Sequence, residues 1–334
     1  MLREMRRVEA NQFVPRRGLR GGHLQTLAGN FLPRQNGLPA AEERLFQVDD
    51  EGQVLCHCHW QPQRRSTLTL MIVHGLEGSS DSQYVIGTGS KAWRRGWNVV
   101  RMNIRNCGGT EKLAPTLYHS GLSDDIRGVV NTLLEQEKLE YFALAGFSMG
   151  GNQVLKCAGE WGREVPPELA AVCAISPACD LSISADELHK LHNRVYEWWF
   201  LLALFRRFRR KAALFPGRFD VSLLKGVRSI RDFDDRITAK YMGFAGADDY
   251  YARASSSRVI DRIAVPTLVI HAKDDPFVVL TAETEVKLRS NPKITYLASN
   301  HGGHCAFLAR SDGYDGRWAE RMIIEFCDNA LSSR

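Results

Sequence analysis

Short apolar segments alternate with amphipathic segments along most of this 334-residue chain. The strand-like segments cover residues 53–60, 67–73, 98–104, 141–147, 170–175, 267–271 and 294–297, and the segment at 67–73 is rich in β-branched residues. The segments between them have helical periodicity, over residues 82–95, 124–138, 152–161, 281–288 and 318–331. Apolar strands that alternate with helices predict an α/β fold, with a mostly parallel central sheet covered by helices on both faces.

Two intervals depart from this alternation. Residues 181–263 contain helix-like sequence and loops but no strand pattern, and they are too long for an ordinary connection. We therefore predict a helical cap or lid inserted into a core formed by residues 46–180 and 264–334. Residues 1–45 are rich in Arg, Gly, Pro and Gln without a clear period, which predicts an N-terminal arm packed on that core.

The composition is that of a globular protein, with 44% apolar and 25% charged residues. Eight cysteines without regular spacing favour reduced thiols over a disulfide framework. The first residues lack the apolar stretch of a secretory signal, and the longest apolar run, residues 198–205, is far shorter than the roughly 20 residues of a membrane span. A cytoplasmic protein is expected.

The net charge of +6 is concentrated in two places, between Arg3 and Arg20 and between Arg206 and Lys211. A nucleic-acid-binding protein would show a basic stripe interleaved with aromatic residues, or a known binding module. Neither pattern is present in the sequence, so no nucleic-acid partner is expected.

The candidate nucleophile lies in Gly146-Phe147-Ser148-Met149-Gly150, where a predicted strand passes into a predicted helix. A serine hydroxyl needs a base and a group that orients this base. Asp274 and Asp275 follow the strand at 267–271, and His301 and His304 follow the strand at 294–297. The order serine, acid, histidine, each just past a strand, is the arrangement that the α/β-hydrolase fold requires.

Acyl transfer through a serine also needs two N–H donors aimed at the oxyanion of the tetrahedral intermediate. Met149 directly follows the serine and supplies one donor from the N-terminus of the helix. His74-Gly75-Leu76-Glu77-Gly78 follows the strand at 67–73, and we place the second donor on the backbone N–H of Leu76.

The sequence resembles the YheT-like branch of the α/β-hydrolase superfamily over nearly its whole length. The motifs that carry this resemblance are GHLQT at 22–26, HGLEG at 74–78, YHSG at 118–121, GFSMGGN at 146–152, SIRDFDDRITAKYMGFAGADDYY at 229–251, HAKDDPF at 271–277 and GGHCAFL at 302–308. The resemblance implies a capped α/β-hydrolase fold with Ser148, Asp275 and His304 as the catalytic triad. In that pattern the acid directly precedes the Pro-containing turn and the histidine follows Gly-Gly, which selects Asp275 and His304.

Members of this branch are associated with carboxylic-ester hydrolysis, some on medium-chain acyl esters or phospholipids, and some transfer the acyl group to an alcohol. The chain departs from the branch at Asn106-Cys107-Gly108, where relatives tend to have Arg-Gly-Cys, and in a more aromatic cap segment. Neither departure touches the triad, but the second affects the shape of the acyl pocket.

The predicted activity is that of a carboxylesterase-type serine hydrolase, which acts through an acyl-enzyme on short- to medium-chain acyl esters or lipids. Acyl transfer, phospholipase and thioesterase activity use the same residues, and a non-catalytic ligand-binding protein is the alternative from another class. No cofactor is expected. A metal site at Cys56-His57-Cys58-His59 is disfavoured because alternate side chains of a strand point to opposite faces.

The aromatic and basic run at 198–211 has two interpretations. Its apolar residues recur at helical spacing and share one face, which favours a cap helix over the acyl pocket; these residues are Trp198, Leu201 or Leu202, Phe205 and Phe208. The alternative is a basic, aromatic helix that makes weak peripheral contact with a membrane surface.

Overall fold

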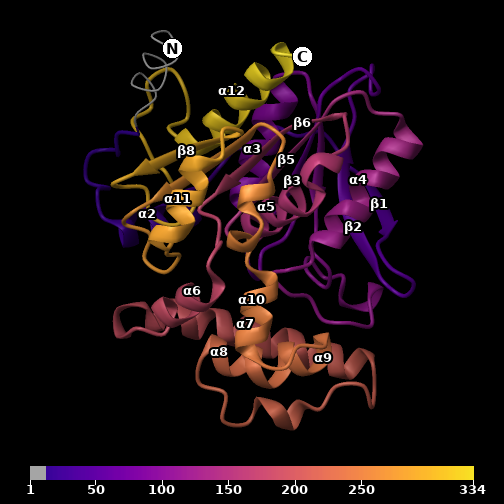
Figure 1. Cartoon of the computed structure of the whole chain (residues 1–334), viewed down its shortest axis with the longest axis vertical. Coiled ribbons are helices and arrows are strands. Elements are labelled where there is room, and N and C mark those ends of the chain that lie inside the picture. The colour runs from indigo at the N-terminus through magenta and orange to yellow at the C-terminus, as the bar shows by residue number, and fades with distance from the viewer. Residues whose placement is uncertain (1–12) are drawn as a thin grey trace.

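A computed structural model describes residues 13–334 of the chain. The start of the predicted arm, with the first arginines of the basic cluster and the residues examined for a signal sequence, lies outside these residues. Figure 1 shows a sheet with flanking helices and a separate group of helices below it.

Eight strands form one sheet in the order β1-β2-β4-β3-β5-β6-β7-β8. Their bounds are β1 Glu42–Gln47, β2 Gln53–His59, β3 Thr69–Val73, β4 Asn98–Met102, β5 Phe142–Phe147, β6 Leu169–Ile175, β7 Thr267–Ala272 and β8 Ile294–Ser299. β1 and β2 are antiparallel to their neighbours, and the strands from β4 to β8 are parallel. The predicted mostly parallel sheet is therefore confirmed.

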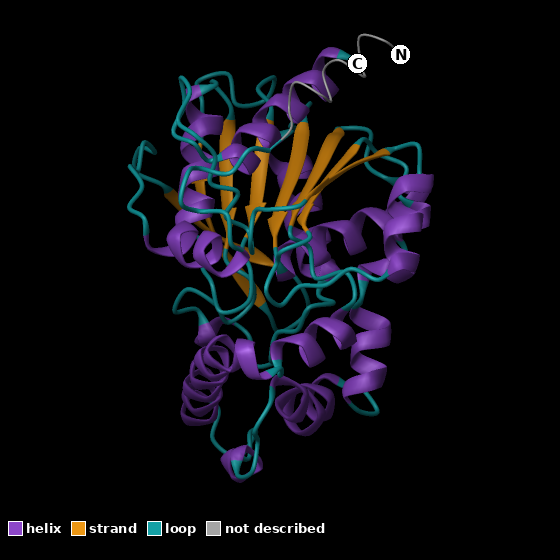
Figure 2. Ribbon diagram, turned by 90° about the vertical axis from the view of Figure 1, so that its left-hand side faces the viewer, coloured by secondary structure: helices purple, strands orange, loops and turns teal. Residues whose placement is uncertain are grey.

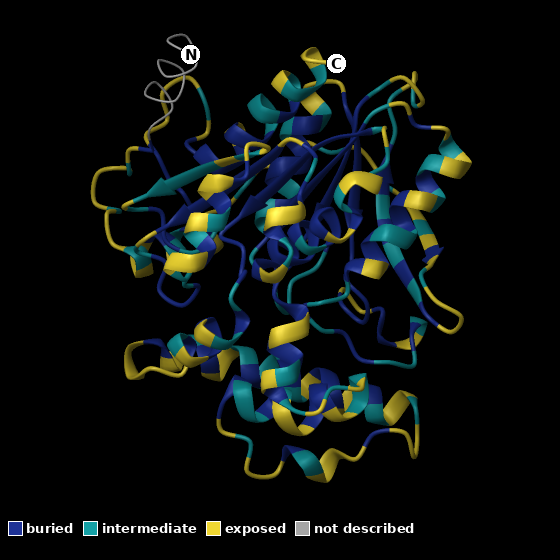
Figure 3. Cartoon of the chain, in the orientation of Figure 1, coloured by how far each residue is buried: buried dark blue, intermediate teal, exposed yellow. Residues whose placement is uncertain are grey.

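Two apolar layers cover the sheet, so its central strands are buried on both faces. Phe142 and Leu144 of β5 pack into one layer, and Ala143, Ala145 and Phe147 pack into the other. The first layer includes residues of α4 (Ser123–Glu137), α5 (Met149–Trp161) and α11 (Ala282–Ser290). The second includes residues of α3 (Gln83–Arg94) and α12 (Trp318–Ser332). Figure 3 shows the resulting buried centre of the molecule.

The N-terminal arm contains two elements that the sequence pattern did not predict. α2 (Gly22–Phe31) is a helix, and β1 is a strand whose residue Phe46 is buried. The predicted boundary at residue 45 falls within β1, which pairs with β2 along its whole length. The sheet thus begins earlier in the chain than the sequence indicated.

The interval between β6 and β7 contains helices and turns and no strand. Its helices are α6 (Leu181–Leu188), α7 (Arg194–Leu214), α8 (Ile230–Phe233), α9 (Lys240–Met242) and α10 (Ala247–Ala254), with a π-helical turn at Asp234–Ala239. Figures 1 and 2 both show these helices gathered below the sheet. We call this segment the cap; its role as a cap or lid inserted into the core stays a prediction.

α7 buries Leu201 and Phe208 of its predicted apolar face, and one residue of that face departs from the expectation. Trp198 was expected on the buried face but is 62% exposed, whereas Arg207 and Lys211 of the basic run are buried. Lys211 Nζ donates hydrogen bonds to the carbonyl oxygens of Glu111 and Ala114 and to Asn106 Oδ1. Arg207 and Lys211 therefore cannot contribute to a membrane-docking face, because both cations point into the protein. Weak membrane contact through the remaining residues of this run stays a prediction.

All eight cysteines are free thiols, and seven of them are buried. Within residues 13–334, no helix combines the length and apolar character that crossing a bilayer requires. The same part of the chain holds no cluster of three His, Cys, Asp or Glu side chains suited to a metal ion.

Candidate active site

Ser148 lies in a strained turn between β5 and α5. Its backbone has φ 55° and ψ −118°, a region that residues with a side chain rarely adopt. The flanking glycines make the turn possible: a Cβ on Gly146 would lie 2.2 Å from the Gly150 carbonyl oxygen, and one on Gly150 would lie 2.4 Å from the His74 carbonyl oxygen. Strain of this kind persists only where the surrounding structure holds it, and it is concentrated at functional sites.

The structure brings Asp275 and His304 together from the loops after β7 and β8. His304 Nδ1 lies 2.8 Å from Asp275 Oδ2. Asp275 Oδ1 accepts hydrogen bonds from the backbone N–H groups of Phe277 and Val278, at 3.2 and 2.9 Å. Because the Nδ1–H donates to the carboxylate, the neutral imidazole has Nε2 as its acceptor nitrogen.

Burial and ion pairing act in opposite directions on this pair. Burial disfavours the His304 cation, but the Asp275 carboxylate outweighs it and raises the pKa of His304 well above its ordinary value. Burial likewise disfavours the Asp275 anion, but the charge and hydrogen bond of His304 outweigh it and lower the pKa of Asp275. The pair is thus stabilised as a His304 cation beside an Asp275 carboxylate. A histidine that acts as a base has this charge while it holds the proton.

Ser148 and His304 share no hydrogen bond within the described residues. Such bonds are often long in free enzymes and shorten when substrate binds. The ring of Phe277 packs on the His304 ring, with 4.4 Å between centroids, and Phe277 lines the same pocket as Ser148. His304 is therefore in contact with a residue that lines the pocket into which the serine opens.

The alternative candidates Asp274 and His301 form a second, more exposed pair. His301 Nδ1 lies 3.3 Å from Asp274 Oδ2, and the two side chains are 44% and 22% exposed. Asp274 Oδ1 also accepts a hydrogen bond from the Gly303 N–H at 2.9 Å. This second pair holds the turn that precedes His304, which suits a supporting role.

A buried histidine holds the loop that follows β3. His74 Nε2 accepts a hydrogen bond from the Ile104 N–H at 3.0 Å, and His74 Nδ1 lies 2.7 Å from the Gly75 carbonyl oxygen. The proton must therefore be on Nδ1, and burial lowers the pKa of His74 to about 4. Since the peptide plane is trans, fixing the Gly75 carbonyl turns the Leu76 N–H to the opposite side.

The same loop runs beside the serine. A Cβ on Gly75 would lie 3.1 Å from the Ser148 Cβ, so a larger residue would crowd the nucleophile turn. Leu76, Ser148 and Met149 all line one pocket. The residues predicted to supply the oxyanion donors are thus close neighbours of the predicted nucleophile.

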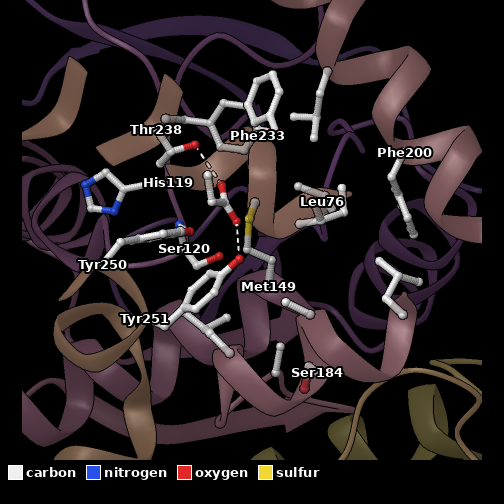
Figure 4. A pocket seen from close by; sticks show the side chains of 18 of the residues that line it. Leu76, His119, Ser120, Met149, Ser184, Phe200, Phe233, Thr238, Tyr250 and Tyr251 are labelled. Atoms are coloured by element: carbon white, nitrogen blue, oxygen red, sulfur yellow. Dashed lines mark hydrogen bonds between the residues drawn. The ribbon is translucent and has the colours of Figure 1, made fainter. Parts of the chain in front are cut away.

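The pocket is lined by residues of both the core and the cap, and most of them are apolar (Figure 4). Its apolar lining includes Leu76, Leu117, Met149, Leu181, Leu188, Phe200, Leu204, Phe208, Ile230, Phe233, Phe277 and Val278. His119 also lines it, and burial lowers the pKa of His119 to about 3, so this ring is neutral. Such a lining suits an acyl chain.

An ion pair ties the cap to the loop after β3. Arg207 of α7 donates hydrogen bonds from Nε and Nη2 to the two carboxylate oxygens of Glu77, at 2.8 and 2.9 Å. Glu77 Oε1 also accepts a hydrogen bond from the Tyr118 hydroxyl. Both members of the ion pair are about nine-tenths buried. Sequence analysis identified Arg207 as part of a basic run and did not predict this contact.

The helix α2 holds the loop that carries His304. Thr26 Oγ1 accepts a hydrogen bond from the His304 N–H at 2.8 Å. The buried Gln25 side chain donates to the Leu308 carbonyl oxygen and accepts from the Leu308 N–H, at 3.2 and 2.8 Å. Gly22 makes the contact possible, because a Cβ there would lie 1.7 Å from the Asp274 carbonyl oxygen. The resemblance at residues 22–26 was the one sequence signal for this role.

Replacing Gln25 with alanine, or Thr26 with valine, is expected to lower kcat/KM for ester hydrolysis about 10- to 100-fold. Each change frees one end of the loop that positions His304, and Gln25→Ala also leaves the buried Leu308 N–H without its acceptor. Steady-state kinetics on one ester measure the effect. Leu24→Ala, at a 54% exposed position of the same helix, is the control and should change little. Full activity in both variants would show that α2 does not position the histidine.

Comparison with known proteins places this architecture in a family. Residues 69–311 match the family model described as "alpha/beta hydrolase fold". The chain is 33% identical over 97% of its length to the Escherichia coli (strain K12) protein named "Putative esterase YheT", of which the match covers 95%. The chain therefore belongs to the α/β-hydrolase fold family, among hydrolases of the esterase, lipase and phospholipase type.

Two further similarities extend this result. The chain is 27% identical to the phospholipase ABHD3 of Mus musculus, over 85% of this chain and 70% of that protein. The fold is similar to that of the Pyrococcus furiosus esterase Pf2001, with a TM-score of 0.56, 15% identity, and coverage of 95% of this chain and 99% of that chain. The resemblance to the YheT-like branch is thereby confirmed.

Proposed function

We propose that this chain is a serine carboxylic-ester hydrolase that acts through an acyl-enzyme. The observation that carries the proposal is the buried His304–Asp275 pair, joined at 2.8 Å beside a pocket into which the strained Ser148 opens. Ser148 is the nucleophile, His304 the general base and acid, and Asp275 the residue that orients the imidazole.

In the first half-reaction, Ser148 Oγ forms a bond with the ester carbonyl carbon while its proton passes to His304 Nε2. The carbonyl electron pair moves onto the oxygen, which the N–H groups of Leu76 and Met149 stabilise. When the intermediate collapses, the bond to the alcohol oxygen breaks and His304 returns the proton to the leaving alcohol. The acyl group remains on Ser148.

In the second half-reaction, water gives a proton to His304 Nε2 while its oxygen forms a bond with the acyl carbon. The bond from that carbon to Ser148 Oγ then breaks, His304 returns the proton to Oγ, and the carboxylic acid leaves. An alcohol in place of water would give acyl transfer, so the two activities share every residue. The apolar pocket supports short- to medium-chain acyl esters or lipids as substrates. The names of relatives, a phospholipase among them, support the same substrate class.

The test is hydrolysis of p-nitrophenyl esters with acyl chains from acetyl to palmitoyl, combined with mass spectrometry of the intact protein. We expect turnover to peak at a short or medium chain, and a mass increase equal to the acyl group on the wild type. Ser148→Ala serves as the control that cannot be acylated. A protein that turns over no ester and carries no adduct would favour the non-catalytic binding protein instead.

A further inference from the structure

One carboxylate lies in the mostly apolar pocket. Asp234 begins the π-helical turn Asp234–Ala239 and lines the same pocket as Ser148 and Met149. Arg207, another charged residue of the lining, is already paired with Glu77. Within residues 13–334 no basic side chain forms an ion pair with Asp234; Arg231, three positions earlier, pairs with Asp186 and Asp248 instead. Asp234 therefore has no ion-pair partner among these residues; the nearby Arg231 guanidinium acts on its charge only at longer range and lies over the Tyr251 ring, 5.0 Å from the centroid.

Two hydroxyl groups fix the orientation of this carboxylate. Thr238 Oγ1 donates to Asp234 Oδ1 and the Tyr251 hydroxyl donates to Asp234 Oδ2, each at 2.7 Å. The two donors come from different segments, and Figure 4 shows the Thr238 and Tyr251 bonds on the pocket wall opposite Leu76. An ionised carboxylate can accept about four hydrogen bonds, so each oxygen retains capacity for a ligand.

The surroundings favour a cation over any other ligand. Burial raises the pKa of Asp234 to about 6 against the opposing effects of the two hydroxyl donors and of the Arg231 charge, so the carboxylate is charged at neutral pH. Phe233, Tyr250 and Tyr251 line the pocket beside it, and the Tyr250 and Tyr251 rings lie 5.1 Å apart. The faces of such rings attract alkylammonium groups. His119, on the same wall, is neutral and does not repel a cation.

We propose that Asp234, together with Tyr250 and Tyr251, forms a subsite for an ammonium group of the substrate. This inference rests on the proposed esterase function and narrows its substrate class to esters that carry a cationic group on the alcohol or the acyl part. Asp234 is then a specificity-determining residue, because a buried anion is stabilised by a substrate cation and repels a substrate carboxylate.

The test compares pairs of esters that have the same shape but differ in charge. One pair is a choline ester and its isostere in which carbon replaces the charged nitrogen; a second pair carries the trimethylammonium group, or its carbon isostere, at the end of the acyl chain. We expect the wild type to prefer the cationic member of one pair by about tenfold or more in kcat/KM. The pair that shows the preference tells which half of the ester occupies the subsite.

Asp234→Asn should reduce this preference by about tenfold, because the amide keeps the shape but not the charge. Asp235→Asn is the matched control, since Asp235 is exposed and an asparagine there can still accept the Ala247 N–H. The preference of the wild type should also decline as the pH falls through about 6, where Asp234 gains a proton. Changes in His304 affect both esters of a pair alike and cancel in the ratio.

Each outcome decides the proposal. Equal kcat/KM values for both members of both pairs, with normal hydrolysis of the neutral esters, would overturn the subsite and leave the esterase intact. Absence of turnover with any ester would overturn the proposed function; calorimetric titration with tetramethylammonium, on wild type and Asp234→Asn, would then test the subsite by itself. A preference that survives in Asp234→Asn would assign the recognition to other residues.

Discussion

Replacing Ser148 with alanine is expected to lower kcat for ester hydrolysis by about 10⁴- to 10⁶-fold, because the members of such a triad act as a unit. In the proposed mechanism the hydroxyl oxygen forms the acyl bond, and no other hydroxyl occupies the turn between β5 and α5. The residual rate over water would come from the N–H groups of Leu76 and Met149 and from substrate binding.

The same substitution is expected to leave the fold unchanged. Alanine has the same Cβ as serine, so the positive φ of 55° carries the same strain in both proteins. The melting temperature of the variant should therefore match that of the wild type within a few degrees. Steady-state kinetics with a p-nitrophenyl ester and a thermal melt measure both quantities. More than about 1% of wild-type kcat in a well-folded Ser148→Ala protein would remove Ser148 from the mechanism.

Asp275→Asn is expected to lower kcat by about 10⁴-fold, whereas Asp274→Asn should lower it no more than about tenfold. Asparagine at 275 offers an amide where the imidazole needs an acceptor, which favours the wrong tautomer and no longer stabilises the cation. Asp274 contacts the more exposed His301 and the Gly303 N–H, and an asparagine can still accept that backbone bond.

The pH profile gives this comparison a second readout. In the wild type, Asp275 raises the pKa of His304, so kcat/KM should increase with pH as His304 loses its proton. Without the carboxylate that pKa falls, and the acidic limb of the remaining activity should move to lower pH. Asp274→Asn should leave the limb in place. The reverse result, with Asp274→Asn the more damaging change, would exchange the roles of the two aspartates.

The sequence was sufficient to predict seven of the eight strands and the region of the candidate triad, and a topological rule connects the two. Carboxyl ends of parallel strands meet at one edge of a sheet, so residues just past β5, β7 and β8 were expected near one another. The choice between Asp274 and Asp275 was different. The spacing of the motifs did not distinguish the two aspartates, and the choice of Asp275 rested on the resemblance to a family. In the structure each aspartate has a histidine partner.

What the sequence did not predict has a common physical cause: polar residues that are buried. In α2 the buried positions include Gln25, while Leu24 and Leu27 are exposed, which inverts the usual amphipathic pattern. In α7 the buried residues include Arg207 and Lys211. β1 buries one side chain, Phe46, and so carries little apolar signal. Such positions are specified by tertiary hydrogen bonds that no local pattern records.

The ion pair between Arg207 and Glu77 constrains any attempt to graft a foreign cap onto this core. A replacement helix without a guanidinium at position 207 would leave Glu77 buried and unpaired, a change that typically destabilises a protein by about 3–5 kcal/mol. The damage would fall on the residue next to Leu76, far in sequence from the graft. The loop after β3 and the helix α7 therefore depend on each other. A change of cap that preserves the chemistry has to exchange residues 77 and 207 together.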